Sequence, residues 1–481
     1  MKVLFVVSEC VPFIKSGGLA DVAGALPKEL RSLGTDVRVI LPKYGGIPHE
    51  FRSKMKRKKE FFVSVGWRNQ YCGIEEYTES GVTYYFVDNE YYFNRDRLYG
   101  YFDDGERFAY FTRAVLESIA VLDFYPDVIH CHDWHTGMVP FLLRSEYQER
   151  PGYSFIRSVF TIHNLQFQGI YPKQVMTDLL AIPERYFHHE YLEFYGNINF
   201  MKGALISSDF VTTVSPTYKE EILTPYYGEK LHNILGQRYN QLLGILNGID
   251  DEVYNPDEGE FPYFSGNLHG KKKAKRHLQK SMGLEESEGI PLVSIISRLT
   301  NQKGLELVRG VFHEMIQENV QFVLLGTGDW EFEQFFREME WTYPDKVRVQ
   351  IGFNEELAKQ IYSASDLFLM PSKFEPCGLG QLIAMRYGAL PLVRETGGLN
   401  DTVESYNEET KTGNGFSFKN FNAHDMLYTY RRALSYFYED PETWNHIVRT
   451  AMNKDYSWAQ SAFKYNQLYA DLVSRSESHV F

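Results

Sequence analysis

Residues 2–42 read KVLFVVSECVPFIKSGGLADVAGALPKELRSLGTDVRVILP, and this stretch decides the fold class. An apolar run over residues 3–7 leads into a loop with two glycines. A helix-like segment and a second apolar run, DVRVILP, follow. Short, nearly continuous apolar runs are typical of parallel strands that are covered on both faces. We therefore expect strand, loop, helix and strand.

Residues 291–328 repeat this plan as PLVSIISRL, TNQKG, LELVRGVFHEMIQENV and QFVLLGTG. Further strands are expected at 127–131, 158–163 and 210–215 in the first half, and at 346–353, 366–372 and 390–395 in the second. Strands that alternate with helices indicate βαβ units. The prediction is an α/β chain with two doubly wound, Rossmann-like domains that face each other across a deep cleft.

The domain boundary is expected near residue 250, within the turn-rich segment NGIDDEVYNPDEGEFPYFSGN (247–267). This gives domains at 1–250 and 251–459, with a C-terminal helix at 460–481 as a candidate addition to the first domain. In such sheets, ligands bind beyond the carboxyl ends of the strands.

Composition excludes several classes of protein. The net charge of the 481 residues is -13, which disfavours nucleic-acid binding. No apolar run reaches the roughly 18 residues of a membrane span. The four cysteines are widely spaced, which indicates a cytoplasmic protein without disulfides. Two basic runs, 54–59 and 271–276, are expected to be solvated surface.

The first expected strand leads into Lys15, Ser16, Gly17 and Gly18. Glycines let the backbone approach a ligand, and a following helix N-terminus favours an anion. The pattern matches neither an ATPase P-loop nor a dinucleotide fingerprint. A plain turn between strand and helix remains the alternative.

The first strand of the second half leads into Arg298 and Lys303, two cations five positions apart. Their place before a helix suits a diphosphate leaving group. Two surface charges are the alternative.

Glu375 lies in PSKFEPCGLG (371–380), a turn-rich segment that follows an apolar strand, and ETGGL (395–399) precedes another helix. We expect the carboxylate to face the cleft. A helix-capping carboxylate and a left-handed turn are the respective alternatives.

The segment HCHDWH (130–135) is dense in possible metal ligands. Alternation along a strand places His130 and His132 on one face and Cys131 and Asp133 on the other. Because no second cluster with ligand spacing follows, we expect no metal site. His163 ends another strand, where a hydrogen-bonded core histidine is the alternative to a functional one.

Taken together, KSGGLADV, HDWH, TIHN, VSPTY, NGID, SRLTNQKG, PSKFEPCGL and TGGL-x-DTV occur in one order from end to end. This series resembles the bacterial glycogen synthase and plant starch synthase family, which has the GT-B fold. The resemblance covers nearly the whole chain.

The resemblance implies roles for individual residues. Glu375 matches an essential glutamate near the transferred glucose, and His163 matches a histidine beside the reacting sugar. Arg298 and Lys303 match residues that hold the donor phosphates. The other implied donor-site residues are Lys15, Gly17, Gly18, Asp21, Asn247, Thr396, Gly397, Gly398 and Leu399. Asp133 and Asn164 match residues on the acceptor or sugar side.

Two positions depart from related patterns. Related α-glycosyltransferases often carry a second acid eight residues after the glutamate. This chain has Ile383 at that position, which favours the glycogen synthase branch, where the acid is usually absent. Gly380 stands where threonine is common, so a hydroxyl contact is lost.

The implied reaction moves glucose from ADP-glucose to the non-reducing end of an α-1,4-glucan, with retention of configuration. UDP-glucose is a possible donor, glycogen or a malto-oligosaccharide is the acceptor, and no cofactor is expected. The sequence leaves front-face attack and a covalent intermediate both open. A nucleotide-dependent oxidoreductase and a non-catalytic glucan-binding relative are the other classes, although the candidate fingerprint Gly326-Thr327-Gly328 has Glu331 at its third glycine position.

Overall fold

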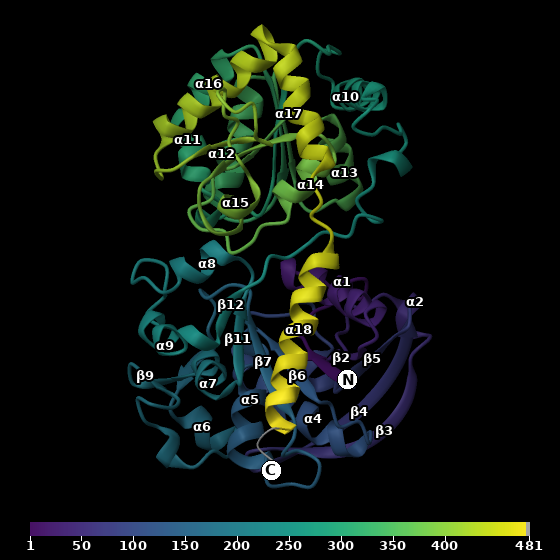
Figure 1. Ribbon diagram of the computed structural model, residues 1–481, viewed down its shortest axis with the longest axis vertical. Helices are drawn as coiled ribbons and strands as arrows, with labels where there is room; N and C mark the ends of the chain where they lie inside the picture. The colour runs from purple at the N-terminus through teal and green to yellow at the C-terminus, as the bar shows by residue number, and fades with distance from the viewer. Residues whose placement is uncertain (478–481) are drawn as a thin grey trace. The chain divides into compact units, whose positions relative to one another are not determined.

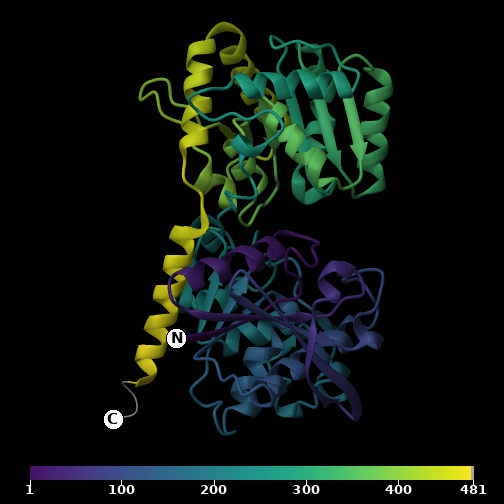
Figure 2. The ribbon, with the colours of Figure 1, turned by 90° about the vertical axis from the view of Figure 1, so that its right-hand side faces the viewer.

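The computed structural model describes residues 1–477, which form two compact α/β units (Figures 1 and 2). Unit 1 contains Met1–Asn247 together with the last helix, α18 (Trp458–Glu477). Unit 2 contains Gly248–Ser457. The final residues of the helix expected at 460–481, 478–481, lie outside the described residues.

Unit 1 is built on a nine-stranded sheet in the order β12-β11-β7-β6-β1-β2-β5-β4-β3. Its strands are β1 (Lys2–Val6), β2 (Asp36–Pro42), β3 (Lys56–Val65), β4 (Arg68–Glu79), β5 (Val82–Asp88), β6 (Val128–His132), β7 (Arg157–Ile162), β11 (Phe210–Thr213) and β12 (Leu242–Gly244). The strands from β12 to β5 run parallel, whereas β4 and β3 extend the edge in antiparallel fashion. The strand order reverses between β1 and β6.

The predicted strands of the first half are confirmed, but the antiparallel edge was not predicted. A small separate sheet joins β8 (Ile170–Pro172), β10 (Asn197–Asn199) and β9 (Glu193–Phe194). The segment 54–65 begins with a run of charges, so it lacks the continuous apolar pattern of a buried strand. Its basic residues are exposed along β3, as expected.

The principal helices of unit 1 are α1 (Gly18–Ser32), α4 (Asp104–Val121), α5 (Met138–Leu142) and α7 (Phe200–Ser207). Helix α18 packs beside α1 (Figure 1) and contributes Trp458, Tyr465 and Tyr469 to the core of the unit. The hydroxyl of Thr35 also donates to Asn466 at 2.6 Å. Unit 1 is therefore completed by the far end of the chain.

Unit 2 has a six-stranded parallel sheet in the order β15-β14-β13-β16-β17-β18. The strands are β13 (Leu292–Ile296), β14 (Gln321–Gly326), β15 (Val347–Ile351), β16 (Leu367–Met370), β17 (Leu390–Arg394) and β18 (Phe416–Phe418). Renumbered from β13, this is the order 3-2-1-4-5-6 of the Rossmann fold. The strands that were predicted for this half are confirmed, and the order reverses between β13 and β16.

Both faces of this sheet are buried, as its apolar strands require. Along β14, Phe322 and Leu324 belong to one core cluster, and Val323 and Leu325 belong to another. The first cluster is completed by α11 (Leu305–Gln317), α12 (Trp330–Thr342), α14 (Gly380–Arg386), α16 (Ala423–Glu439) and α17 (Pro441–Asn453). The second is completed by α10 (His269–Ser281) and α13 (Glu355–Ala364).

The expectation of solvated surface is wrong for two lysines of the basic run 271–276. Lys275 is 4% exposed, and its ammonium lies 2.8 Å from the Asp366 carboxylate. Lys271 is 8% exposed, and its ammonium donates to the backbone carbonyls of Ser363 and Tyr387, both at 2.9 Å. The run lies on α10, whose two faces differ: Lys271 and Lys275, four residues apart, share the buried face, whereas Lys272 and Lys273 are exposed.

In the part of the chain that the structure describes, no helix is both long and apolar enough to cross a membrane. All four cysteines are buried and unpaired.

Candidate active site

In unit 2, the loops after β13 and β16 meet where the strand order reverses, which is where ligands bind in open α/β sheets. Lys303 ends a short 3₁₀ turn (Asn301–Lys303) after β13, and Glu375 follows β16. The ammonium of Lys303 lies 2.8 Å from one carboxylate oxygen of Glu375 and 3.1 Å from the other. The structure therefore brings these two predicted residues into direct contact.

Glu375 is buried, at 5% exposure, and the hydroxyl of Ser372 also donates to its carboxylate at 2.9 Å. A buried carboxylate needs hydrogen-bond or ion-pair partners, and Glu375 has both. Arg298 is exposed and forms no ion pair with any residue in the described range 1–477. The positive charge of Lys303 is therefore balanced by Glu375, whereas that of Arg298 is available to an anion.

Two glycines let the loops of this site touch through their backbones. Gly304 has a φ of 69°, and an added Cβ would lie 1.8 Å from the carbonyl oxygen of Pro371. Gly397 has a φ of 46°, and its Cβ would lie 1.8 Å from the carbonyl oxygen of Glu375. The N–H of Gly398 donates to that same carbonyl at 3.1 Å. Only glycine combines this conformation with this approach.

The segment Thr396 to Leu399 therefore lies against the Glu375 loop, as α15 (Gly397–Thr402) begins. Leu399 is fully buried in the core of unit 2, so only its backbone is left to face a ligand. Arg394, which was not predicted, is buried at the end of β17 and donates to the carbonyls of Ser372 and Lys373. A charged residue that ends a buried apolar strand is the signal that could have found it.

In unit 1, the loop after β1 carries Lys15, Gly17 and Gly18, and a buried carboxylate that was not predicted organises it. Glu9 is 3% exposed and accepts the backbone N–H groups of Ser16, at 2.8 Å, and Gly17, at 3.2 Å. Burial raises the pKa of the Glu9 carboxyl, and the bonds from Ser16 and Gly17 oppose this rise. Glu9 thus fixes the glycine loop. Its position in the sequence, just after a buried strand, is the feature from which it could have been predicted.

Lys15 is part exposed, and its ammonium lies 2.8 Å from the carboxylate of Asp21 on α1. Two residues of the predicted donor set are therefore paired with each other.

The loops after β6 and β7 bring three further predicted residues together. The carboxylate of Asp133 accepts the backbone N–H of His163 at 2.8 Å. Burial raises the pKa of Asp133 to about 7, opposed by backbone hydrogen bonds from His163 and Asn164. Asp133 adopts a φ of 57°, a rare conformation for a residue with a side chain, which often marks functional sites. Asp133 therefore shapes the loop that carries His163.

His163 is half-buried as a residue, and burial of its imidazole lowers the pKa of the ring to about 3. Its Nε2 lies 2.9 Å from Nδ1 of His132, another histidine with a lowered pKa. Both rings are therefore neutral at pH 7, and His163 can offer one N–H donor to a ligand but no positive charge.

His130 and His132 share a face of β6, as predicted, and their rings stack with centroids 4.1 Å apart. The nitrogens of His130 contact the hydroxyls of Tyr469 and Thr161. Within the described residues, no group of three or more His, Cys, Asp or Glu side chains could hold a metal ion.

Asn247, the last predicted residue of unit 1, is 7% exposed. Its side-chain oxygen has no hydrogen-bond partner among residues 1–477. An unpaired buried acceptor is uncommon and is consistent with a ligand contact.

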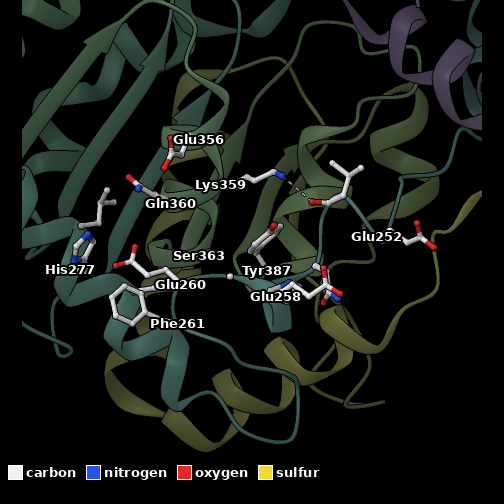
Figure 3. A pocket seen from close by; sticks show the side chains of 16 residues that line it. Glu252, Glu258, Glu260, Phe261, His277, Glu356, Lys359, Gln360, Ser363 and Tyr387 are labelled. Carbon is white, nitrogen blue, oxygen red and sulfur yellow. Dashed lines mark hydrogen bonds between the residues drawn. The ribbon is translucent and has the colours of Figure 1, made fainter. Parts of the chain in front are cut away.

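A cavity of about 500 Å³ lies elsewhere in unit 2, between α10, α13 and the segment 252–261 (Figure 3). Four carboxylates line it, those of Glu252, Glu258, Glu260 and Glu356. None of the residues that line this cavity belongs to the predicted site.

Two family models match this chain, one in each half. Residues 2–237 match the family model described as starch synthase catalytic domain, and residues 279–453 match glycosyl transferases group 1. The chain is 65% identical to glycogen synthase from Anoxybacillus flavithermus over 100% of both chains. It is 62% identical to glycogen synthase from Geobacillus stearothermophilus over 99% of both. These matches contradict the oxidoreductase alternative.

Solved structures give the same result. The catalytic domain of starch synthase IV from Arabidopsis thaliana, bound to ADP and acarbose, superimposes with a TM-score of 0.93 at 35% identity, covering 98% of this chain and 99% of that one. Sucrose-phosphate synthase from Thermosynechococcus elongatus shares the fold, with a TM-score of 0.63 at 18% identity over 98% and 99% of the two chains. The chain belongs to the glycogen synthase and starch synthase family of glycosyltransferases, which has the GT-B fold.

Proposed function

We propose that this glycosyltransferase moves glucose from ADP-glucose to the non-reducing end of an α-1,4-glucan, with retention of the anomeric configuration. The contact between Lys303 and Glu375 carries this proposal. It lies where the strand order of unit 2 reverses, and it places a cation that can bind phosphate beside a carboxylate that can interact with a sugar. The related starch synthase that binds ADP and acarbose supports an adenine nucleotide and a saccharide as ligands.

On this proposal, unit 2 holds the donor. As the bond from glucose C1 to the diphosphate oxygen breaks, ADP gains negative charge. Arg298 and Lys303 stabilise that charge, together with the N-terminus of α11, a helix that is kinked at Val311. Phosphate binding draws Lys303 toward the anion, and Glu375 then stabilises positive charge on the sugar ring or orients the sugar.

Unit 1 supplies the groups on the acceptor and sugar side. His163, as a neutral ring, donates a hydrogen bond to a glucose hydroxyl, and Asp133 and Asn164 shape the same loop. Lys15, Asp21 and the glycine loop, with Asn247, complete the proposed donor contacts.

Retention requires an even number of inversions or attack from the face that the leaving group vacates. In front-face attack, the acceptor hydroxyl bonds to C1 and its proton passes to the departing phosphate oxygen, so atoms and charge balance without a protein base. The alternative is a covalent glucosyl-carboxylate intermediate that the acceptor then displaces.

The cytoplasm is the proposed location, since four buried unpaired cysteines suit a reducing compartment.

The test is incubation of the full chain with glycogen and either ADP-glucose or UDP-glucose, followed by measurement of chain extension and NMR of the new linkage. We expect α-1,4 extension with a higher kcat/KM for ADP-glucose. A higher value for UDP-glucose would reverse the donor assignment, and a β-linked product would overturn retention. Binding of both ligands with no transfer or donor hydrolysis would favour a non-catalytic glucan-binding protein.

A further inference from the structure

His132 lies behind the proposed sugar-side histidine and is held rigidly. It ends β6 and is fully buried, and its Nδ1 is 2.9 Å from Nε2 of His163. Its ring stacks on His130, whose two nitrogens contact Tyr469 on α18 and Thr161 on β7. Phe5 also packs against the His132 ring, with ring centroids 5.0 Å apart, so that burial and ring contacts hold the side chain in place.

The hydrogen bond between the two rings has only two possible arrangements, since each neutral imidazole carries one proton. If His163 donates through Nε2, the proton of His132 must sit on its own Nε2. That atom is buried and has no hydrogen-bond partner in the described part of the chain. An N–H would then be left without an acceptor, and buried N–H groups without acceptors are rare.

If His132 donates through Nδ1 instead, its Nε2 carries only a lone pair. An unpaired buried acceptor is tolerated more often than an unpaired buried donor. The second arrangement requires the proton of His163 to sit on Nδ1. That nitrogen has no hydrogen bond to residues 1–477 and is not among the buried unpartnered polar atoms, and His163 is only half-buried, so Nδ1 is free to meet a ligand.

We propose that His132 is a positioning residue that donates a hydrogen bond to His163 and fixes it in the Nδ1–H form, so that His163 presents a donor to the sugar. This proposal rests on the proposed role of His163 in sugar binding. Because His132 is fully buried, it acts through His163 and not on the sugar directly. The Tyr469 contact links this arrangement to α18, which comes from the end of the chain.

Two variants of His132 form a matched pair. The amide of asparagine falls near the position of imidazole Nδ1, whereas the amide of glutamine falls near that of Nε2. His132→Asn therefore keeps a donor toward His163, and His132→Gln loses it while remaining polar and of similar size. We expect kcat to fall by about 10- to 100-fold in His132→Gln, since misplacing a reacting group has effects of that order. His132→Asn should recover at least about tenfold of this loss, and the Kd for ADP alone should change in neither, because ADP lacks the glucose.

The second measurement observes the tautomer directly, by ¹⁵N NMR of histidine-labelled full-length protein, with His163→Gln identifying the His163 signals. We expect the Nδ1–H form in the wild type and in His132→Asn, and a change in His132→Gln. The Nε2–H form in the wild type would overturn the proposal, as would equal kcat in the two His132 variants when both remain folded by thermal melting. Normal activity of His163→Gln would refute the proposed role of His163 in sugar binding. The NMR result does not depend on turnover, so the tautomer of His163 in the wild-type protein could still be measured in that case.

Discussion

At the scale of single residues, the site of unit 2 depends on one ion pair. Lys303 and Glu375 are 72 positions apart in sequence. They meet because each follows one of the two neighbouring strands, β13 and β16, between which the strand order reverses. Without ligand the pair satisfies both charges, and the hydroxyl of Ser372 completes the shell of the carboxylate. Each partner is therefore both a structural neighbour of the other and a proposed catalytic group.

Glu375→Gln should lower kcat by about 10²–10³-fold, the usual effect of removing one preorganised group that stabilises developing charge. The amide keeps the size of the side chain, so the fold should survive, as judged by circular dichroism and thermal melting. The measurement is incorporation of labelled glucose into glycogen. Ser372→Ala, which removes only a supporting hydroxyl, serves as the control and should lose far less. Turnover of Glu375→Gln within about twofold of wild type would refute the role of the carboxylate.

Lys271 illustrates a different use of a buried charge. Its ammonium donates to the carbonyls of Ser363 and Tyr387, and among residues 1–477 it forms no ion pair with a carboxylate. Burial lowers the pKa of Lys271 to about 7, from a usual value of 10.5. Between these two values the unfolded chain binds a proton that the folded chain does not, so the free energy of unfolding rises with pH.

The corresponding prediction is that Lys271→Met removes part of this rise. Wild type should gain about 2 kcal/mol more than Lys271→Met between pH 7 and pH 9, measured by urea unfolding of unit 2. Lys272→Met, at an exposed neighbour on the same helix, is the matched control and should keep the wild-type slope. Identical pH slopes for wild type and Lys271→Met would show that Lys271 stays protonated throughout.

At the scale of elements, the loops after the strands are held by backbone contacts that exclude side chains. Gly304 and Gly397 both have positive φ values and both abut a carbonyl oxygen of the loop after β16. Three loops that pack together therefore set the position of Glu375. A substitution in either neighbouring loop should shift Glu375.

Gly397→Ala should shift the backbone of Glu375, because the added methyl would overlap its carbonyl oxygen. We expect a fall in kcat of at least about tenfold and a loss of stability of about 1–3 kcal/mol, the range for strained backbone positions. Gly310→Ala is the control, since its Cβ would meet only Ala423 at 3.7 Å within an exposed part of α11. That variant should be neutral or slightly more stable. Equal behaviour of the two variants in assay and melting would contradict the packing argument.

At the scale of the whole molecule, the chain begins in unit 1, builds unit 2 and returns to finish unit 1 with α18. The aromatic side chains of this helix enter the core of unit 1, where Tyr465 is 1% exposed and Tyr469 is fully buried. The stability of unit 1 therefore depends on residues that are synthesised after all of unit 2.

Tyr465→Ala should destabilise unit 1 by about 3–5 kcal/mol, as expected for truncation of a large buried ring. Lys464→Ala, one position earlier and exposed, should have almost no effect. Differential scanning calorimetry of the full chain should show the loss in only one of two transitions. A Tyr465→Ala transition as stable as that of Lys464→Ala would mean that α18 contributes little to the core.

Much of the fold could be predicted from local sequence. The apolar runs that became β1, β2, β13 and β14 are short and nearly continuous, and burial on both faces of a parallel sheet requires that pattern. The antiparallel edge of β3 and β4 escaped prediction because an exposed edge strand needs no such pattern. Lys271 and Lys275 were misjudged because charge in a sequence does not reveal which face of a helix is buried.

The sequence by itself determined which residues follow strands, and therefore that Lys15, Arg298, Lys303, Glu375 and His163 lie at carboxyl ends of parallel strands, because strand and turn preferences are local. Only the tertiary structure decided which of them touch. The order of strands in a sheet is set by crossover connections and by packing of distant segments. For that reason the contacts of Glu9, His132 and Arg394 appear only in the tertiary structure: each involves a partner whose position in space no local pattern encodes.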